Sequence, residues 1–320
     1  TEVDTLSLHD ALPISFKKWV GTWSTAPQLV EPRNMPPEPG LSHNSLRQVV
    51  RVSLGGDSLR IRFSNEFSSL PTQMQAVQIA TSTGGSAIDV STIKELNFNG
   101  NSRVTIPSEG AVTSDPISFK LDPREDIAIT IEFGETPEDL TGHPGSRTTS
   151  YLAKDKRISA PDFSEATKTD HWYIISGIDV KAPQSSAAVA IIGNSITDGR
   201  GSGTNKQNRW PDVLSARLLE NSGTKNVGVL NQGIGGNAVL RGGLGPTALD
   251  RFDRDALGQA GVKWLIIMQG VNDLGGTKDS TAAGQVADGL ISAYQEMIDK
   301  AHEQNLKVYG GTITPIKKSF

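Results

Sequence analysis

Residues 187–198 read AAVAIIGNSITD, an apolar run of six residues that ends at Gly193, Asn194 and Ser195. The run does not alternate apolar with polar side chains, which is typical of a parallel strand covered on both faces. The sequence after it contains further periodic segments, which we expect to be strands at 227–230, 262–268 and 307–313 and helices at 211–220 and 282–305. This alternation of strands and helices predicts an α/β fold with a parallel sheet over residues 187–320.

The preceding half of the chain has a different pattern. Residues 59–63 (LRIRF) and 127–133 (IAITIEF) alternate apolar and polar side chains, so each is expected to bury one face, and 46–53 and 74–80 are weaker candidates. Clusters of Gly, Asn, Asp, Ser and Pro separate these short strands, and no long helical window interrupts them. We therefore expect an antiparallel β-sandwich domain over residues 16–180, followed by a polar linker at 181–186.

Composition excludes several classes of function. The chain has 31 basic and 35 acidic residues, so no basic excess exists to hold a nucleic acid. It has no cysteine, which excludes a disulfide framework, a cysteine nucleophile and a thiolate metal site. Its apolar runs are too short to span a bilayer, and no motif calls for a cofactor or a metal.

The first residues need separate treatment. Residues 5–14 read TLSLHDALPI, which resembles the translation of a DNA-sequencing adapter. We expect residues 1–15 to be an adapter-derived or disordered segment and exclude them from fold reasoning. A signal peptide is not visible, and its absence carries no information if the natural start has been replaced.

Three short motifs each follow a predicted strand directly. They are GNSI at 193–196, NQGIGGN at 231–237 and GVND at 270–273. Ligands of open parallel sheets gather at the carboxyl ends of the strands, where all three motifs would meet. Ser195 could attack an ester carbonyl, while the Gly236 N–H and the Asn272 side chain could hold the oxyanion, each donor contributing roughly 3–4 kcal/mol. Taken singly, each motif is more often a turn or a helix cap, but the three in succession predict a site.

Two other interpretations were weighed. Residues 233–238 (GIGGNA), with Asp253 beyond them, imitate a dinucleotide-binding fingerprint. That fingerprint normally follows the first strand of its domain, whereas this one follows the second and leaves Ser195 and Asn272 unexplained. Alternatively, the β half could be a carbohydrate-binding module that uses tryptophans, although burial of these rings is the simpler expectation; the candidates are Trp19, Trp23 and Trp172.

With these motifs in place, the chain resembles the GDSL (SGNH) hydrolase superfamily, whose sequence blocks centre on Ser, Gly, Asn and His. The first three blocks correspond here to Ser195, Gly236 and Asn272. WVGTW at 19–23 and GNSITDG at 193–199 are similar to the acetylxylan-esterase-like branch, which carries a β-rich domain ahead of the hydrolase domain.

The resemblance implies a flavodoxin-like three-layer parallel sheet, incomplete at the C-terminus, and a serine ester hydrolase that deacetylates carbohydrate esters. Its partner would be a small-molecule or polysaccharide ester, and its location would be extracellular or periplasmic. A lipid ester is the alternative substrate.

Two departures from the family pattern matter. Most members have Asp before the nucleophile, where this chain has Asn194, a side chain that can still hydrogen-bond locally. The family's general base belongs to an Asp-x-x-His block that we expect beyond Phe320, so we expect the chain to be a C-terminally truncated, nearly inactive fragment.

No other histidine is a convincing substitute for that base. His302 matches Asp-x-x-His by letter, but it lies in the helix before the fourth strand, and His9 falls in the adapter-like segment. The remaining three lie in the β half, where they are expected to be surface or structural residues: His43, His143 and His171. Of these, His143 or His171 would border the cleft only if the β half packs over it.

Overall fold

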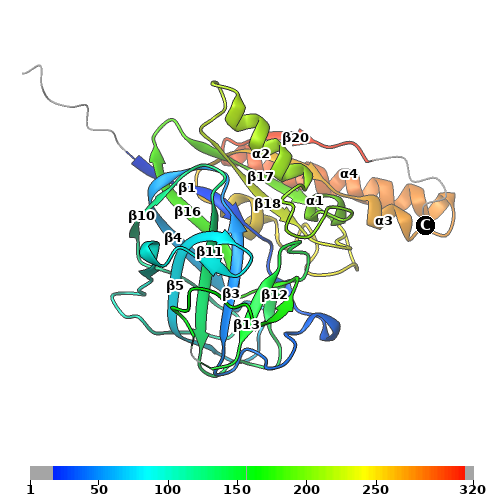
Figure 1. The fold of residues 1–320 in the computed structure, drawn as a ribbon. Coiled ribbons are helices and arrows are strands. Elements are labelled where there is room, and N and C mark those ends of the chain that lie inside the picture. Colours follow the sequence, from blue (N-terminus) through cyan, green and yellow to red (C-terminus); the bar gives the residue numbers. More distant parts are fainter. Residues whose placement is uncertain (1–16, 156, 314–320) are drawn as a thin grey trace, which may run out of the picture.

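The computed structural model describes residues 17–155 and 157–313. The adapter-like segment at 5–14 therefore lies outside the described residues. Within them, Figure 1 shows a β-rich N-terminal half and a second half in which helices flank a sheet. No helix among the described residues has the length and apolar character needed to cross a membrane.

The N-terminal half is built from antiparallel strands. Its main sheets have the orders β1-β16-β4-β10, with β9 paired to β4, and β14-β13-β3-β11-β5-β6, with β7 and β8 paired to β5; a smaller sheet has the order β15-β12-β2. The strands are β1 (Lys17–Ser24), β2 (Gln28–Leu29), β3 (Ser45–Arg51), β4 (Gly56–Ser64), β5 (Thr72–Gly84), β6 (Ala87–Ile88), β7 (Lys94–Glu95), β8 (Val104–Ile106), β9 (Ala111–Thr113), β10 (Ile117–Leu121), β11 (Asp126–Phe133), β12 (Thr141–His143), β13 (Ser150–Ala153), β14 (Thr167–Thr169), β15 (Trp172–Tyr173) and β16 (Ile175–Pro183). Two 3₁₀ helices lie between strands, η2 (Pro32–Asn34) and η3 (Val90–Thr92).

The alternating segments of the sequence form the strands that they predicted. β4 buries Leu59, Ile61 and Phe63 and leaves the intervening arginines partly exposed. β11 instead is buried on both faces, because it lies between β3 and β5 in the middle of its sheet. The polar stretch at 181–186 was predicted wrongly as a linker: its first three residues complete β16, which pairs with β1 up to Pro183.

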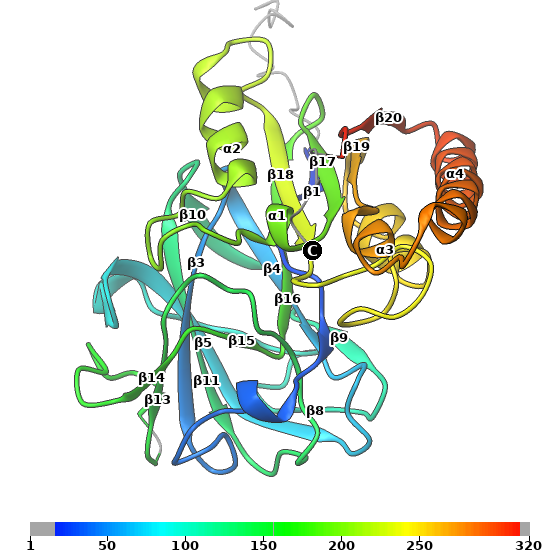
Figure 2. The same cartoon turned by 90° about the vertical axis from the view of Figure 1, so that its right-hand side faces the viewer.

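The second half contains a parallel sheet of order β18-β17-β19-β20. Its elements are β17 (Ala187–Gly193), α1 (Ser195–Asp198), α2 (Trp210–Glu220), β18 (Val227–Gly233), the π-helix η4 (Asp253–Leu257), β19 (Val262–Met268), α3 (Val271–Gly275), α4 (Ser280–Glu303) and β20 (Lys307–Gly310). One face packs against α2 through Val189, Ile191 and Val229, and the other packs against α4 through Ala190, Ile192 and Leu265. Figure 2 shows α2 and α4 on opposite sides of these strands.

The two halves share a core. Ala188 and Leu230 of the parallel sheet belong to the same buried apolar cluster as the N-terminal strands. β1 packs against β18 so closely that a Cβ at Gly21 would collide with Leu230. The hydroxyl of Ser53 accepts a hydrogen bond from Val229 N at 2.9 Å and donates to the Thr22 carbonyl at 2.5 Å. The N-terminal half is therefore packed tightly against the sheet that carries the predicted site.

Candidate active site

Ser195 lies in a sharp turn between the central strand β17 and the short helix α1. It is the first residue of α1 and is half-buried, and its N–H has no acceptor within the helix because of this position. Asn194 caps the helix, with its Oδ1 accepting from Ile196 N at 3.0 Å. The expectation that Asn194 hydrogen-bonds locally is thus confirmed. Gly199 ends α1 at a φ of 115°, a left-handed conformation that favours glycine.

Gly236 lies in the loop that follows β18, next to β17 in the sheet. Its φ of 74° requires a residue without a side chain, and a Cβ there would press against Leu244 at 3.2 Å. The same loop folds back, and Leu244 N donates to the Gly236 carbonyl at 3.2 Å. Gly236 remains half-buried, so its backbone is accessible from the carboxyl edge of the sheet.

Asn272 lies in the first turn of α3, directly after β19 on the other side of β17. Its Nδ2 donates to the Asn237 carbonyl at 2.7 Å, which links the third motif to the second. An amide NH₂ carries two hydrogens, so one stays available for a ligand. The carboxylate of Asp273 accepts hydrogen bonds from Val239 N and Leu240 N in the loop after β18.

Arg251 connects the carboxyl ends of β17 and β18 through hydrogen bonds to one backbone carbonyl of each strand. It is fully buried, and its guanidinium donates to the carbonyls of Gly193 at 3.1 Å and Gln232 at 2.7 Å. It also donates to Asn237 Oδ1 at 3.0 Å and pairs with Asp255 at 2.9 Å. Burial lowers the pKa of Arg251, while the nearby carboxylates of Asp255 and Asp198 act in the opposite direction.

Asn237 is the second connector of the site. Its Oδ1 accepts from Arg251 and, at 2.9 Å, from Gln269 Nε2, and its Nδ2 donates to the carbonyls of Leu244 and Pro246. A side chain that uses all its hydrogen-bonding groups in this way holds the loop at 237–246 in one conformation. The three motifs therefore meet at the predicted edge, on the strands β18, β17 and β19.

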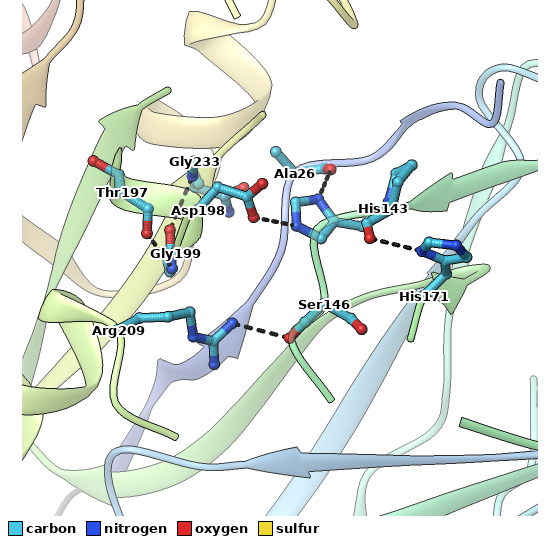
Figure 3. A network of polar contacts seen from close by, with 12 residues as sticks. Ala26, His143, Ser146, His171, Thr197, Asp198, Gly199, Arg209 and Gly233 are labelled. Carbon is cyan, nitrogen blue, oxygen red and sulfur yellow. Dashed lines mark hydrogen bonds and ion pairs between the residues drawn. The ribbon is translucent and has the colours of Figure 1, made fainter. Parts of the chain in front are cut away.

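The histidines occupy different surroundings. His43 is exposed beside Glu135 at 2.9 Å, and His171 faces the Pro144 carbonyl at 2.7 Å. His302 is exposed in the last turn of α4, just before β20 begins, and so lies at the opposite edge of the parallel sheet from Ser195. His143 is buried and its Nε2 lies 2.9 Å from Asp198 Oδ1, three residues after Ser195 (Figure 3).

Sequence reasoning missed Arg251 and Asn237 as site-forming residues and did not connect His143 to Asp198. Asn237 ends the second motif, although no role was predicted for it, whereas Arg251 and Asp255 read as an ordinary helical i, i+4 pair. His143 and Asp198 are 55 positions apart and come from different halves of the chain. Only packing brings these groups together.

Two of the three candidate tryptophans are buried, and the third is partly buried. Trp23 and Trp172 are buried and meet edge to face, with ring centroids 5.0 Å apart. Trp19 is partly covered by Arg60 and Lys181, whose cationic groups lie 4.7 and 4.8 Å from its ring centroid. The expectation that Trp23 and Trp172 are core residues is confirmed.

A cavity adjoins the site at Asn272. It is an open pocket of about 600 Å³ between the loop after β18, α3 and the start of α4. Its wall combines apolar side chains and charged side chains of both signs with the Asn272 amide: Leu240, Val286, Arg241, Lys278, Asp273 and Asp279. A space of this size beside a candidate oxyanion donor can hold one part of a substrate.

The family comparison covers the part of the chain that carries these motifs. Residues 191–319 match the family model of the GDSL-like lipase/acylhydrolase family. The resemblance to this superfamily is thereby confirmed for that segment. No curated protein sequence matches the chain.

Three solved structures illustrate the similarity. A G-D-S-L family protein from Desulfitobacterium hafniense DCB-2 is 22% identical, with 39% of this chain and 58% of that chain covered and a TM-score of 0.29. AlinE4, an SGNH-hydrolase family esterase, is 19% identical, with 43% and 65% covered and a TM-score of 0.32. A family two carbohydrate esterase from Clostridium thermocellum, in complex with cellohexaose, is 12% identical, with 91% and 87% covered and a TM-score of 0.27. The chain thus spans less than two thirds of the length of the first two.

Proposed function

We propose that this chain is part of a serine hydrolase of carboxylic esters and that Ser195 is its nucleophile. One observation carries the proposal: Ser195, Gly236 and Asn272 follow three neighbouring parallel strands, and hydrogen bonds join their loops. β17 has β18 on one side and β19 on the other, which makes it the switch point where such sheets bind ligands. The family match of residues 191–319 supports the same chemistry.

Each residue has a distinct role in the proposed reaction. The Ser195 hydroxyl attacks the ester carbonyl and loses its proton to a general base. The N–H groups of Ser195 and Gly236 and the Asn272 amide stabilise the oxyanion, and water then releases the acyl group. The buried hydrogen bonds of Arg251 and Asn237 hold these donors in place, so that their stabilisation of the transition state is not lost through misplacement.

The general base is not supplied by the described histidines in the positions that they occupy. His43 and His302 are exposed elsewhere, His171 Nδ1 faces the Pro144 carbonyl, and both ring nitrogens of His143 face other partners. We therefore keep the proposal that an Asp-x-x-His block of the parent protein supplies the base. The 320 residues alone should turn over esters slowly, because acylation and deacylation both require the proton transfer.

Slow deacylation offers a direct test. Incubation with p-nitrophenyl acetate should leave an acetyl group on Ser195, detectable by peptide mass spectrometry, and Ser195→Ala should abolish it. Ser202→Ala is the matched control, because its hydroxyl donates to the Gly199 carbonyl at 2.6 Å in the same turn. An acetyl group found on other residues but not on Ser195, in the intact chain, would contradict the assignment.

The substrate class is proposed separately. Short acyl esters of carbohydrates are the first choice, as the resemblance to the acetylxylan-esterase-like branch implies. The exposed side chains of Ile196 and Leu244, each 37% exposed beside the site, favour the lipid ester alternative. A series of p-nitrophenyl esters of increasing chain length distinguishes them: acetyl preference supports a carbohydrate esterase, and octanoyl preference supports a lipid esterase.

We also propose that the two halves of the chain have different roles. We infer that residues 187–320 carry the reaction on a flavodoxin-like sheet, and that residues 16–180 form an antiparallel sandwich that supports it. By the same resemblance we propose an extracellular or periplasmic location. Export of a tagged parent protein, followed by fractionation, tests the location.

A further inference from the structure

His143 belongs to the N-terminal half and contacts Asp198 in the turn that carries Ser195. It ends β12 and is 3% exposed. Its Nδ1 lies 2.9 Å from the Ala26 carbonyl and its Nε2 lies 2.9 Å from Asp198 Oδ1. Figure 3 shows the ring between these two oxygens, so both ring nitrogens face acceptors.

This arrangement determines how many protons the pair holds. The Ala26 carbonyl can only accept, so Nδ1 must carry a hydrogen. At 2.9 Å, a bare Nε2 facing a carboxylate would be repelled, so a second hydrogen lies between Nε2 and Oδ1. The pair is therefore either an imidazolium with a carboxylate or an imidazole with a carboxylic acid.

The surrounding charges favour the ionic form. The buried guanidinium of Arg251 is a positive charge close enough to Asp198 to interact with it electrostatically. The Trp172 ring is stacked 6.0 Å from the His143 ring, where its face attracts a cation. Other ionisable side chains nearby include Arg209, which is paired with Asp212 and lies 5.6 Å from Trp172, Arg254, which donates to the Pro27 carbonyl, and His171 beyond Pro144.

Asp198, one member of this pair, lies in the same turn as Ser195. It is the last residue of α1, and its N–H donates to the Asn194 carbonyl at 2.8 Å. A Cβ at Gly145 would collide with its carboxylate, and a Cβ at Gly233 would collide with its backbone. The turn that carries Ser195 is thus enclosed by the N-terminal half on one side and by β18 on the other.

We propose that His143 and Asp198 form a buried ion pair that positions the Ser195 turn, and that the N-terminal half is for this reason an integral part of the active site. Both residues are positioning residues. The positioning role rests on the proposed function of Ser195, whereas the protonation of the pair can be measured without any reaction.

Nuclear magnetic resonance of the ¹⁵N-histidine-labelled chain tests the pair. His143 should show a hydrogen on both ring nitrogens, with Nδ1–H donated to the Ala26 carbonyl and Nε2–H donated to Asp198. Asp198→Asn should convert His143 to the neutral form with the proton on Nδ1, because the Asn amide then donates to Nε2. A wild-type His143 that is neutral, with its one proton on either Nδ1 or Nε2, would overturn the proposal.

Acetylation of Ser195 by p-nitrophenyl acetate tests the positioning. Asp198→Asn and His143→Gln should each slow it by about 10- to 100-fold per folded molecule, since small displacements of reacting groups have effects of this size. His171→Gln, from the adjoining segment, should leave the rate unchanged. An unchanged rate in both pair variants would overturn the positioning role. If wild-type Ser195 is not acetylated at all, the proposed function fails while the ring protons still decide whether the ion pair exists.

Discussion

Replacing Arg251 by methionine should destabilise the parallel-sheet half more than any change to a neighbouring charge. Methionine keeps the apolar stem but removes the bonds to Gly193, Gln232 and Asn237. It also leaves Asp255, 1% exposed, with only Arg254 as a partner. Removing one member of a buried ion pair costs about 3–5 kcal/mol, and because Arg254 remains we expect about 3 kcal/mol.

Urea unfolding followed by circular dichroism measures this cost, and Arg254→Met is the matched control. Arg254 is 26% exposed and Asp255 would keep Arg251, so the control should lose only about 1 kcal/mol. Adding Asp255→Asn to Arg251→Met should recover part of the loss, since no uncompensated buried carboxylate remains. Equal losses in the two arginine variants would refute the idea that Arg251 is the central support of the site.

Three further outcomes are expected. Asn272→Ala should slow acetylation of Ser195 by about 10²–10³-fold, measured by the same mass spectrometric assay, because one oxyanion donor is lost. Gly236→Ala should lower the free energy of unfolding by about 1–3 kcal/mol in urea, since its φ of 74° strains any other residue. Burial raises the pKa of Tyr173 to about 12, and its hydroxyl donates to the Asn34 carbonyl at 2.7 Å. The stabilisation from its neutral phenol should persist below about pH 10 and disappear as the pH rises through 12; Tyr173→Phe should remove the corresponding phenolate absorbance from a spectrophotometric titration.

The second half of the chain was predicted well because its signals are local. The run at 187–192 is apolar throughout and forms the central strand, and β19 has the predicted bounds of Val262–Met268. Helix α2 begins one residue before the predicted start and α4 two residues before it. Motifs that directly follow parallel strands must meet at one edge, so Ser195, Gly236 and Asn272 could be grouped from order alone.

In the first half of the chain, local sequence patterns predicted strands but not the pairing between strands. Alternation identified β4 and β11, but it could not reveal that β11 lies inside its sheet, since pairing partners come from β3 and β5 far along the chain. The error at 181–186 has the same origin, because pairing with β1 extends β16 through residues whose polarity is typical of a linker.

The sequence by itself predicted that three motifs follow parallel strands and so identified Ser195, Gly236 and Asn272, because such signals are short-range patterns. Only the tertiary structure decided what holds them. Arg251 looks like a surface arginine in sequence, yet the fold buries it under two strand ends. His143 looks like a residue of a separate domain, yet packing places it 2.9 Å from Asp198. Such contacts form only when segments that are far apart in the sequence pack together, so no short stretch of sequence can predict them.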